Sequence, residues 1–316
     1  ELGENIAIVR NTHGKYLSVY SEADWEAYCA KIKEKLPTEE KEIVIISTND
    51  IHGRIEQFSK LATFVKRIKE EHPNVILVDA GDRFTGNPYV DHAKEKGFPI
   101  ISLMNDLGYE VGTLGNHEFD FGQKILRARI NDATFPIICA NINSSRGELD
   151  SIPPYHIIEK DGKLGFISFV QTETDQIPST NPERLKDITF DHYLDKVEDY
   201  KPLKRQCDVL IGLTHLGVDK DSILATQMPE LDIIIGGHTH TSKEINNVII
   251  GQTGLKLQYA GLTILKFTKG KLTERSYQSC LIDTITRVDS CITRKVNYFM
   301  EQPEFKEVIG ISSLPF

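Results

Sequence analysis

The sequence lacks any apolar run long enough to cross a membrane, and it lacks an excess of positive charge. A membrane-spanning helix needs about 20 consecutive apolar residues, and none of the 316 residues begins such a run. The formal net charge is −9, which disfavours bulk binding of nucleic acid because a phosphate-rich polymer would be repelled. A small anionic substrate remains compatible with this charge, since bound metal ions reverse the local sign of the field.

Cysteine is also scarce, and no two cysteines are spaced as Cys-X-X-Cys. Five scattered cysteines are too few to scaffold a domain with disulfides. Cys139 and Cys207 lie beside apolar runs, which predicts buried thiols, whereas Cys280 and Cys291 could pair in an oxidising compartment. The sequence begins at Glu1 without a signal-like segment, which we interpret as a processed start that carries no information about export.

Short β-branched apolar runs recur along the chain from residue 42 onward. They lie at 43–48, 75–80, 111–114, 135–140, 166–170, 209–214 and 233–236. Apolar residues at helical spacing separate several of them, as in Leu61, Val65 and Ile68, and again over 100–107 and 192–206. Near-continuous apolar strands that alternate with amphipathic helices predict an α/β fold in which helices cover both sides of the sheets.

The two ends of the chain depart from this alternation. Residues 1–41 indicate an N-terminal extension with a hairpin, whose strands span 5–9 and 16–19, followed by a helix. That helix is indicated by Trp25, Cys29, Ile32 and Leu36. Beyond Gly237 the helical pattern stops, and 248–250, 255–259 and 263–268 predict a run of antiparallel strands. We expect 42–270 to form the main domain. We expect 271–316 to be a tail or linker with a strand and a helix around 296–300, too short for a core of its own.

Chemically reactive side chains stand directly after five of the predicted strands. The five segments are Asn49-Asp50-Ile51-His52-Gly53, Asp79-Ala80-Gly81-Asp82, Gly115-Asn116-His117-Glu118-Phe119-Asp120, Thr214-His215-Leu216-Gly217 and Gly237-His238-Thr239-His240. Ligands of α/β sheets bind beyond the carboxyl ends of the strands, so these loops are expected to converge in one cleft. Oxygen and imidazole ligands without thiolate suit Zn, Mn, Fe, Co or Ni.

Each segment has an ordinary structural interpretation when it is taken alone. Asp50-X-His52 is typical of a capped turn, and a single histidine such as His215 is more often a core or surface residue. His238 and His240 carry more weight, because alternate strand residues share one face. All five segments in order, each at a predicted strand end, favour a metal centre with seven ligands. These are Asp50, His52, Asp82, Asn116, His215, His238 and His240.

The same ordered motifs resemble the calcineurin-like metallophosphoesterases. The segments at 48–53 and 114–122 are similar, more narrowly, to the catalytic domain of the 5′-nucleotidase family. The likeness extends over 42–267 and implies a four-layer α/β/β/α sandwich, with 42–270 as the metallophosphoesterase catalytic domain. It implies hydrolysis of phosphate monoesters, such as 5′-nucleotides or similar small phosphates, by a metal-activated hydroxide.

The resemblance also implies a role for each site residue. Asp50, His52 and His240 would hold one divalent metal ion, Asn116, His215 and His238 would hold the other, and Asp82 would bridge the two. A bridge is reasonable because two dications ~3.5–4 Å apart repel and need a shared anion. His117 would stabilise or protonate the leaving alkoxide. Asp120 would orient His117, although it could also be the N-cap of a helix over 121–130.

Two departures from the family pattern matter. Some nucleotidases of the family carry glutamine at the position of His240, so histidine here could change the metal preference or affinity. The usual C-terminal domain that recognises the nucleobase would begin near 302–310, which leaves the substrate open. We therefore expect a separate nucleotide-binding chain as a partner, and the resemblance implies export to the periplasm or cell surface. A 2′,3′-cyclic nucleotide phosphodiesterase is an alternative activity, and a non-catalytic binding subunit is an alternative of another class.

Overall fold

The computed structural model describes residues 6–10, 16–21, 40–241, 243–245 and 248–306. The chain divides into two compact units, Glu1–Glu40 and Lys41–Phe316. In the first unit, β1 (Ile6–Arg10) and β2 (Tyr16–Ser21) form an antiparallel pair. The helix expected between Trp25 and Leu36 lies outside the described residues. Within the described residues, no helix combines the length and the apolar character that a membrane span requires.

Two six-stranded sheets form the centre of the second unit. The first sheet has the order β16-β15-β3-β4-β5-β6. Its strands are β3 (Glu40–Thr48), β4 (Val75–Asp79), β5 (Val111–Thr113), β6 (Ile137–Ile138), β15 (Tyr259–Thr268) and β16 (Lys271–Leu281). Strands β3 to β6 run parallel to one another, and β15 pairs antiparallel with β16.

The second sheet has the order β13-β14-β12-β11-β9-β8. Its strands are β8 (Tyr155–Glu159), β9 (Lys163–Ile167), β11 (Val209–Leu213), β12 (Ile233–Ile235), β13 (Lys243–Ile245) and β14 (Val248–Gly251). The central strands β9, β11, β12 and β14 are parallel, and the edge strands β8 and β13 are antiparallel. A separate short pair joins β7 (Ile142–Asn143) to β10 (Thr189–Phe190).

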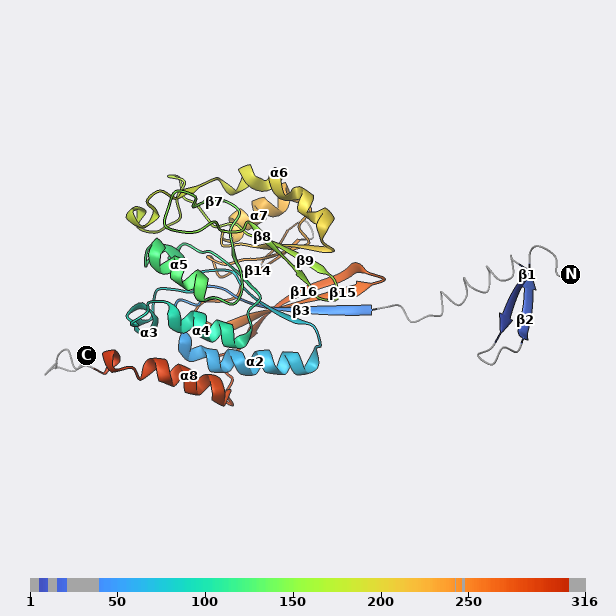
Figure 1. Cartoon of the computed structure of the whole chain (residues 1–316), viewed down its shortest axis with the longest axis horizontal. Helices are drawn as coiled ribbons and strands as arrows, with labels where there is room; N and C mark the ends of the chain where they lie inside the picture. The colour runs from blue at the N-terminus through green and yellow to red at the C-terminus, as the bar shows by residue number, and fades with distance from the viewer. Residues whose placement is uncertain (1–5, 11–15, 22–39, 242, 246–247, 307–316) are drawn as a thin grey trace. The chain divides into compact units, whose positions relative to one another are not determined.

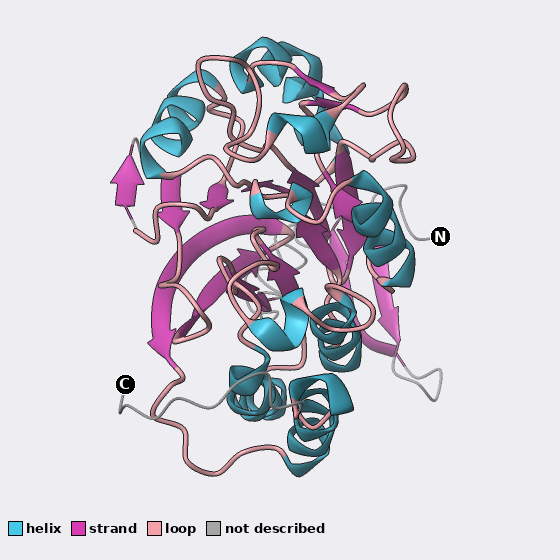
Figure 2. Ribbon diagram, turned by 90° about the vertical axis from the view of Figure 1, so that its left-hand side faces the viewer, coloured by secondary structure: helices cyan, strands magenta, loops and turns pink. Residues whose placement is uncertain are grey.

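Helices cover the outer face of each sheet, as Figures 1 and 2 show. On the first sheet lie α2 (Phe58–Glu71), α4 (Phe98–Leu107) and α8 (Ser290–Met300), and on the second lie α6 (Val197–Tyr200) and α7 (Val218–Gln227). The short α3 (Pro88–Asp91) and α5 (Gln123–Asp132) flank the first group. The predicted four-layer α/β/β/α sandwich is therefore confirmed.

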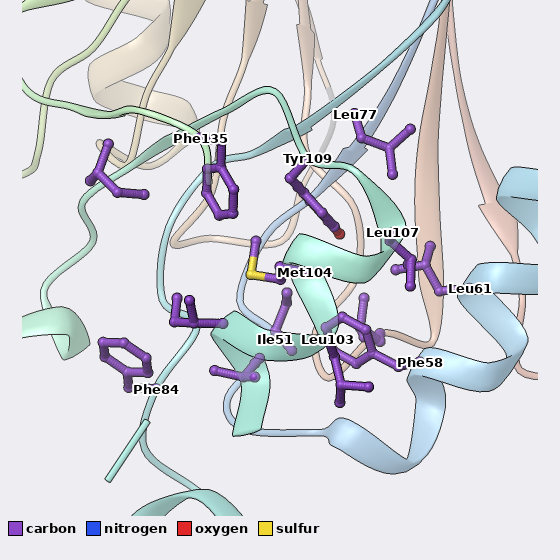
Figure 3. Close-up of a cluster of buried hydrophobic side chains, with 14 of the residues drawn as sticks. Ile51, Phe58, Leu61, Leu77, Phe84, Leu103, Met104, Leu107, Tyr109 and Phe135 are labelled. Atoms are coloured by element: carbon purple, nitrogen blue, oxygen red, sulfur yellow. The ribbon is translucent and has the colours of Figure 1, made fainter. Parts of the chain in front are cut away.

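Successive residues of each central strand enter different cores, which explains why these strands are apolar throughout. In β3, Ile43 and Ile45 lie in the core between the two sheets, whereas Val44 and Ile46 lie in the core beneath α2 and α4. Figure 3 shows part of that outer core, with Phe58 and Leu61 of α2 close to Leu103 and Leu107 of α4. Both faces of these strands are buried, so a polar side chain within them would lose its contact with water. Polar residues therefore gather at the strand ends.

The tail that was expected beyond residue 270 belongs to the second unit. Strand β16 extends the first sheet, and α8 packs against α2 and α4. Asp289 caps α8 by accepting hydrogen bonds from the backbone N–H groups of Cys291 and Ile292, and Val296 and Phe299 are buried in the outer core. The tail is thus held by the main core rather than by one of its own.

Several sequence-based predictions need correction. The helical run over 192–206 is a succession of short pieces, η4 (Tyr193–Lys196), α6 and η5 (Lys201–Gln206), since Pro202 interrupts regular hydrogen bonding. The strand predicted at 255–259 is a turn in which Lys256 and Leu257 have φ of 58° and 54°. There Lys256 N donates to the carbonyl of Asp50 (2.8 Å), so this segment supports a neighbouring loop instead of a ladder. Strand β14 is parallel to β12 and antiparallel to β13 in the second sheet, whereas β15 lies in the first sheet, so 248–250 and 263–268 do not form one antiparallel run.

The cysteines are partly as predicted. Cys139 is buried, Cys207 is only half-buried, and the thiols of Cys280 and Cys291 are both free. Burial raises the pKa of the Cys139 thiol to about 12, which keeps it protonated and unreactive.

Replacing Ile211 with alanine should destabilise the second unit by about 2–5 kcal/mol, because the side chain is fully buried between the two sheets and its loss leaves a cavity. Urea unfolding followed by circular dichroism measures the change. Ile223→Ala is the matched control, since Ile223 is 47% exposed on α7 and its truncation should stay within about 0.5 kcal/mol. Equal shifts for both variants would contradict the two-sheet core.

Candidate metal centre

Five loops meet at the carboxyl ends of the parallel strands. They follow β3, β4 and β5 of the first sheet and β11 and β12 of the second. The first two loops are joined by backbone hydrogen bonds from Asp50 N to the Gly81 carbonyl and from His52 N to the Asp82 carbonyl, both 3.0 Å long. Ile51 and Phe84 anchor the same loops in the outer core, where Figure 3 shows both side chains. The predicted convergence of strand ends is therefore present.

Six of the seven predicted ligands form two groups of three. Asp50, His52 and His240 make one group, and Asp82, His215 and His238 make the other; within each group the ligand atoms lie within 4.8 Å of one another. The groups are adjacent, because Asp50 Oδ1 lies 3.2 Å from His240 Nε2 and 4.0 Å from His215 Nε2. His215 Nε2 in turn lies 3.0 Å from Asp82 Oδ2.

The seventh predicted ligand, Asn116, is buried next to this cluster with its amide already oriented. Its Nδ2 donates to the carbonyl of Ser179 (3.1 Å), whereas Oδ1 is buried and has no hydrogen-bond partner. An unpaired buried carbonyl costs free energy unless a cation or water meets it. The imidazoles of His52 and His215 are oriented similarly, since each uses Nδ1 on a backbone carbonyl, of Thr85 (3.1 Å) and Ala80 (2.7 Å), and so keeps Nε2 for a metal ion. These residues fit a pair of divalent ions.

The charges of the cluster also favour cations. Burial alone would raise the pKa of Asp82, yet the nearby His215 imidazole holds it well below its usual range. Burial alone would lower the pKa of His215, but the Asp82 carboxylate raises it to about 10. The pKa of Asp50 is lowered by His240 and His215 against the effect of its burial. Two buried carboxylates remain ionised only if positive charge lies close to them. A protonated imidazole or a bound metal ion can supply that charge.

The backbone of the site is strained in a way that the sequence does not reveal. Five predicted ligands have positive φ although none is glycine. They are Asp50 (49°), His52 (47°), Asp82 (58°), His238 (83°) and His240 (57°). Each such residue costs on the order of 1–3 kcal/mol and persists only where the surroundings impose it. Such strain gathers at functional sites, where it aims side chains that ordinary turns would direct elsewhere.

His117 and Asp120 form a hydrogen-bonded pair beside the cluster. His117 Nδ1 lies 2.7 Å from Asp120 Oδ2, and the imidazole meets that of His52 edge-on with 5.1 Å between ring centroids. The hydrogen bond to Asp120 raises the pKa of His117 to about 9. The N-cap alternative for Asp120 is not observed, since Gly122 precedes α5 and Asp120 ends the 3₁₀ turn η2 (His117–Phe119).

Comparison with known families assigns the chain to a family. The profile of the calcineurin-like phosphoesterases matches residues 43–242, which include all seven predicted ligands. The chain belongs to the calcineurin-like phosphoesterase family. Members of this family use divalent metal ions, and the two ligand groups described above are where this phosphoesterase could hold them.

Similar proteins narrow the family toward nucleotidases. The rat 5′-nucleotidase is 29% identical over 306 residues, with 81% of this chain and 52% of that protein covered. The trifunctional nucleotide phosphoesterase YfkN of Bacillus subtilis is 32% identical over 242 residues, covering 62% of this chain and 16% of that protein. The chain thus spans about half, or less, of the length of these relatives. The predicted resemblance to the catalytic domain of the 5′-nucleotidases is confirmed.

Solved structures support the same fold. A 5′-nucleotidase precursor from Thermus thermophilus superimposes with a TM-score of 0.73 at 22% identity, covering 82% of this chain and 58% of that one. The calcineurin-like phosphoesterase YfkN from Bacillus subtilis gives a TM-score of 0.69 at 26% identity, covering 82% and 97%.

A fully buried ion-pair network lies beneath the phosphoesterase site. The carboxylate of Glu118 accepts hydrogen bonds from the backbone N–H groups of Asp82 (2.9 Å), Arg83 (2.8 Å) and Gly115 (2.6 Å). The Arg83 guanidinium lies 3.6 Å from Glu118 and 2.5 Å from Asp79. The sequence does not predict that Arg83 is buried rather than exposed to solvent. Its partners are 4 and 35 residues away, and no local pattern links them to Arg83.

The loop with His238 and His240 rests on a second buried network that the sequence did not reveal. Gln252 Oε1 accepts hydrogen bonds from Thr239 N (3.2 Å) and Thr241 N (3.3 Å), and its Nε2 donates to Asp221 of α7 (3.2 Å). Asp221 also accepts from Thr214 Oγ1 (2.6 Å), the residue before His215. Burial raises the pKa of Asp221 to about 7. Two ligand-bearing loops therefore share one support.

Glycine is needed where these loops cross. A β-carbon at Gly115 would collide with the carboxylate of Asp82, and one at Gly237 would lie 2.8 Å from the carbonyl of Ala80. Only a residue without a side chain leaves the backbone room to pass at both positions.

Replacing Glu118 with glutamine should destabilise the phosphoesterase by about 3–5 kcal/mol, because Arg83 and three backbone donors then face a neutral amide in a buried site. It should also lower the amount of Mn²⁺ retained after dialysis, since the backbone of Asp82 is no longer held. Urea unfolding and elemental analysis measure the two effects. Glu70→Gln on the exposed face of α2 is the control and should change neither; retained stability and metal in Glu118→Gln would refute the role of this network.

Proposed function

We propose that the chain hydrolyses phosphate monoesters, with 5′-nucleotides or similar small phosphates as substrates. The observation that carries this proposal is the placement of the His117–Asp120 pair directly beside two adjoining groups of metal-ligand side chains. Family membership supports the reaction class, and the similarity to 5′-nucleotidases supports the nucleotide substrate. Residues 42–270 supply all the proposed site residues and are proposed as the catalytic domain.

Seven residues are proposed as metal ligands. Asp50, His52 and His240 would hold one ion, Asn116, His215 and His238 would hold the other, and the Asp82 carboxylate would be shared between them. The carboxylate, amide and imidazole donors suit Zn, Mn, Fe, Co or Ni. When bound, two such ions lower the pKa of a water molecule towards ~7 and neutralise phosphoryl oxygens. The identity of the ions is open to elemental analysis of the protein purified without chelator.

The residues of this chain account for the fate of the leaving group. Water adds to phosphorus as the bond from phosphorus to the ester oxygen breaks, so an alcohol and inorganic phosphate form. The leaving oxygen needs a proton, and the imidazolium of His117 is proposed to donate it from Nε2 because Nδ1 is engaged by Asp120. Burial raises the pKa of Asp120, but the interactions with His117, Thr85 and Thr180 together outweigh that effect and lower the pKa below its usual value. Asp120 is therefore anionic and stabilises the imidazolium.

Two substitutions separate metal binding from proton donation. Asp82→Asn should abolish turnover of AMP and reduce bound Mn²⁺. The reason is that Asp82 and Asp50 are the two carboxylates of the proposed metal sites, and the substitution removes the negative charge of one of them. His117→Asn should keep the Mn²⁺ content of the wild type yet lower kcat for AMP by about 10²–10⁴-fold. Elemental analysis and phosphate release are measured on the same preparations. A wild-type protein that binds Mn²⁺ but releases phosphate from no ester would favour a non-catalytic binding subunit instead.

A second candidate activity is hydrolysis of 2′,3′-cyclic nucleotides. It is favoured by the similarity to a Bacillus subtilis protein named as a trifunctional nucleotide phosphoesterase, since one centre can serve mono- and diesters. We expect phosphate release from AMP to exceed turnover of 2′,3′-cyclic AMP and of bis(4-nitrophenyl) phosphate at equal concentration. A reversed order would make the diesterase the principal activity.

Selection of the nucleotide and location in the cell are also proposals. The chain covers 52% of the rat 5′-nucleotidase, and we propose that a separate nucleotide-binding domain completes substrate recognition. A domain of that type that neither binds the chain nor changes its KM for AMP would contradict this.

Export to the periplasm or cell surface is proposed from the family resemblance, and phosphatase activity confined to the cytoplasmic fraction would contradict it.

A further inference from the structure

We propose that Thr180 is a positioning residue for the His117–Asp120 pair. The proposal rests on the proposed function, since it concerns the residue assigned to protonate the leaving oxygen. Thr180 lies in the long connection between β9 and β10, and sequence motifs do not single it out. Thr180 lies 60 residues after Asp120 in the sequence. The two residues therefore come together only in the folded chain.

The two oxygens of the Asp120 carboxylate have different hydrogen-bond partners, and the Thr85 hydroxyl also lowers the pKa of this group. Its Oδ2 faces His117 Nδ1 at 2.7 Å, and its Oδ1 accepts a hydrogen bond from Thr180 Oγ1 at 2.8 Å. Asp120 is partly open to solvent, with 22% of its side chain exposed. A carboxylate held only by the imidazole could rotate and accept from water. The hydroxyl of Thr180 holds the second oxygen and so fixes the plane of the carboxylate.

The preceding residue orients a proposed ligand from the same segment. The carbonyl of Ser179 accepts from Asn116 Nδ2 at 3.1 Å, which leaves Asn116 Oδ1 for a cation. Two adjacent residues therefore contact two side chains of one loop, Asn116 and Asp120. We call residues 179 and 180 the clamp. It sets the position of the proton donor relative to the proposed metal ligands.

The clamp is itself rigidly attached. Asn181 caps the 3₁₀ turn η3 (Pro182–Leu185) by accepting from Glu183 N at 3.0 Å. Leu185 is buried in the outer core. The amide of Gln123 in α5 donates to the carbonyls of Arg184 (3.2 Å) and Lys186 (2.7 Å). Because α5 begins just after Asp120, the clamp and the residue that it holds are fastened to one helix.

The clamp is tested with two substitutions and two esters. Thr180→Val keeps the shape and removes the donor, and Thr180→Ser keeps the donor. We expect Thr180→Val to lower kcat for AMP roughly tenfold, the effect of losing one hydrogen bond to a charged group, with KM and Mn²⁺ content unchanged. Turnover of 4-nitrophenyl phosphate should fall less than about twofold, because 4-nitrophenolate leaves without needing a proton. Thr180→Ser should restore kcat for AMP to within about threefold of the wild type.

Thr134→Val is the matched control, since the Thr134 hydroxyl also donates a side-chain hydrogen bond, to Asn105, but at an exposed position. Its kinetics should equal those of the wild type. An active wild type with a Thr180→Val variant of equal kcat for AMP would overturn the clamp alone. Equal losses on both esters without rescue by serine would assign Thr180 a purely structural role and overturn it too. A wild type inactive on both esters overturns the proposed function and the clamp together.

Discussion

Two buried carboxylates, Asp50 and Asp82, are the constraint on which the rest of this structure depends. They lie at the ends of neighbouring parallel strands with almost no exposure to water, where an uncompensated negative charge is costly. Imidazoles, backbone N–H groups and, in the proposed function, two metal ions supply the compensation. His238 N donates to Asp50 Oδ2 (2.9 Å) and His117 N to Asp82 Oδ1 (2.9 Å). Each carboxylate is thus oriented by a loop that carries another site residue.

Holding these charges in place requires a rigid surrounding. The loops that carry the proposed metal ligands adopt left-handed backbone conformations at several residues other than glycine, and such conformations relax unless neighbouring groups enforce them. Glu118 enforces them on the side of the first sheet, through three backbone donors and Arg83. Gln252 and Asp221 do so on the side of the second sheet. The site is consequently a product of both sheets, and neither sheet alone could hold it.

The apolar strands explain how the two halves reach one another. Alternate residues of β3 and β11 fill the core between the sheets, and their neighbours fill the cores beneath the helices. The two sheets pack face to face through this shared core, and the carboxyl ends of their parallel strands lie at the same edge. The tail helix α8 adds to this arrangement from outside, since it closes the apolar surface of α2 and α4. Packing therefore positions the chemistry, although no apolar residue takes part in it.

The sequence by itself determined most of the central strands, several of the helices and the order of the reactive segments, because these depend on local periodicity and on residue types that stand next to one another. Asp50-X-His52 and His238-X-His240 were readable for that reason. Tertiary structure alone decided that 255–259 turns to support Asp50, that Arg83 is buried, and that Asp221, Gln252 and Thr180 support the site. Each of these depends on partners that lie far apart in the chain, as Thr180 and Asp120 do, and hydrogen bonds between distant polar residues leave no periodic trace in a sequence.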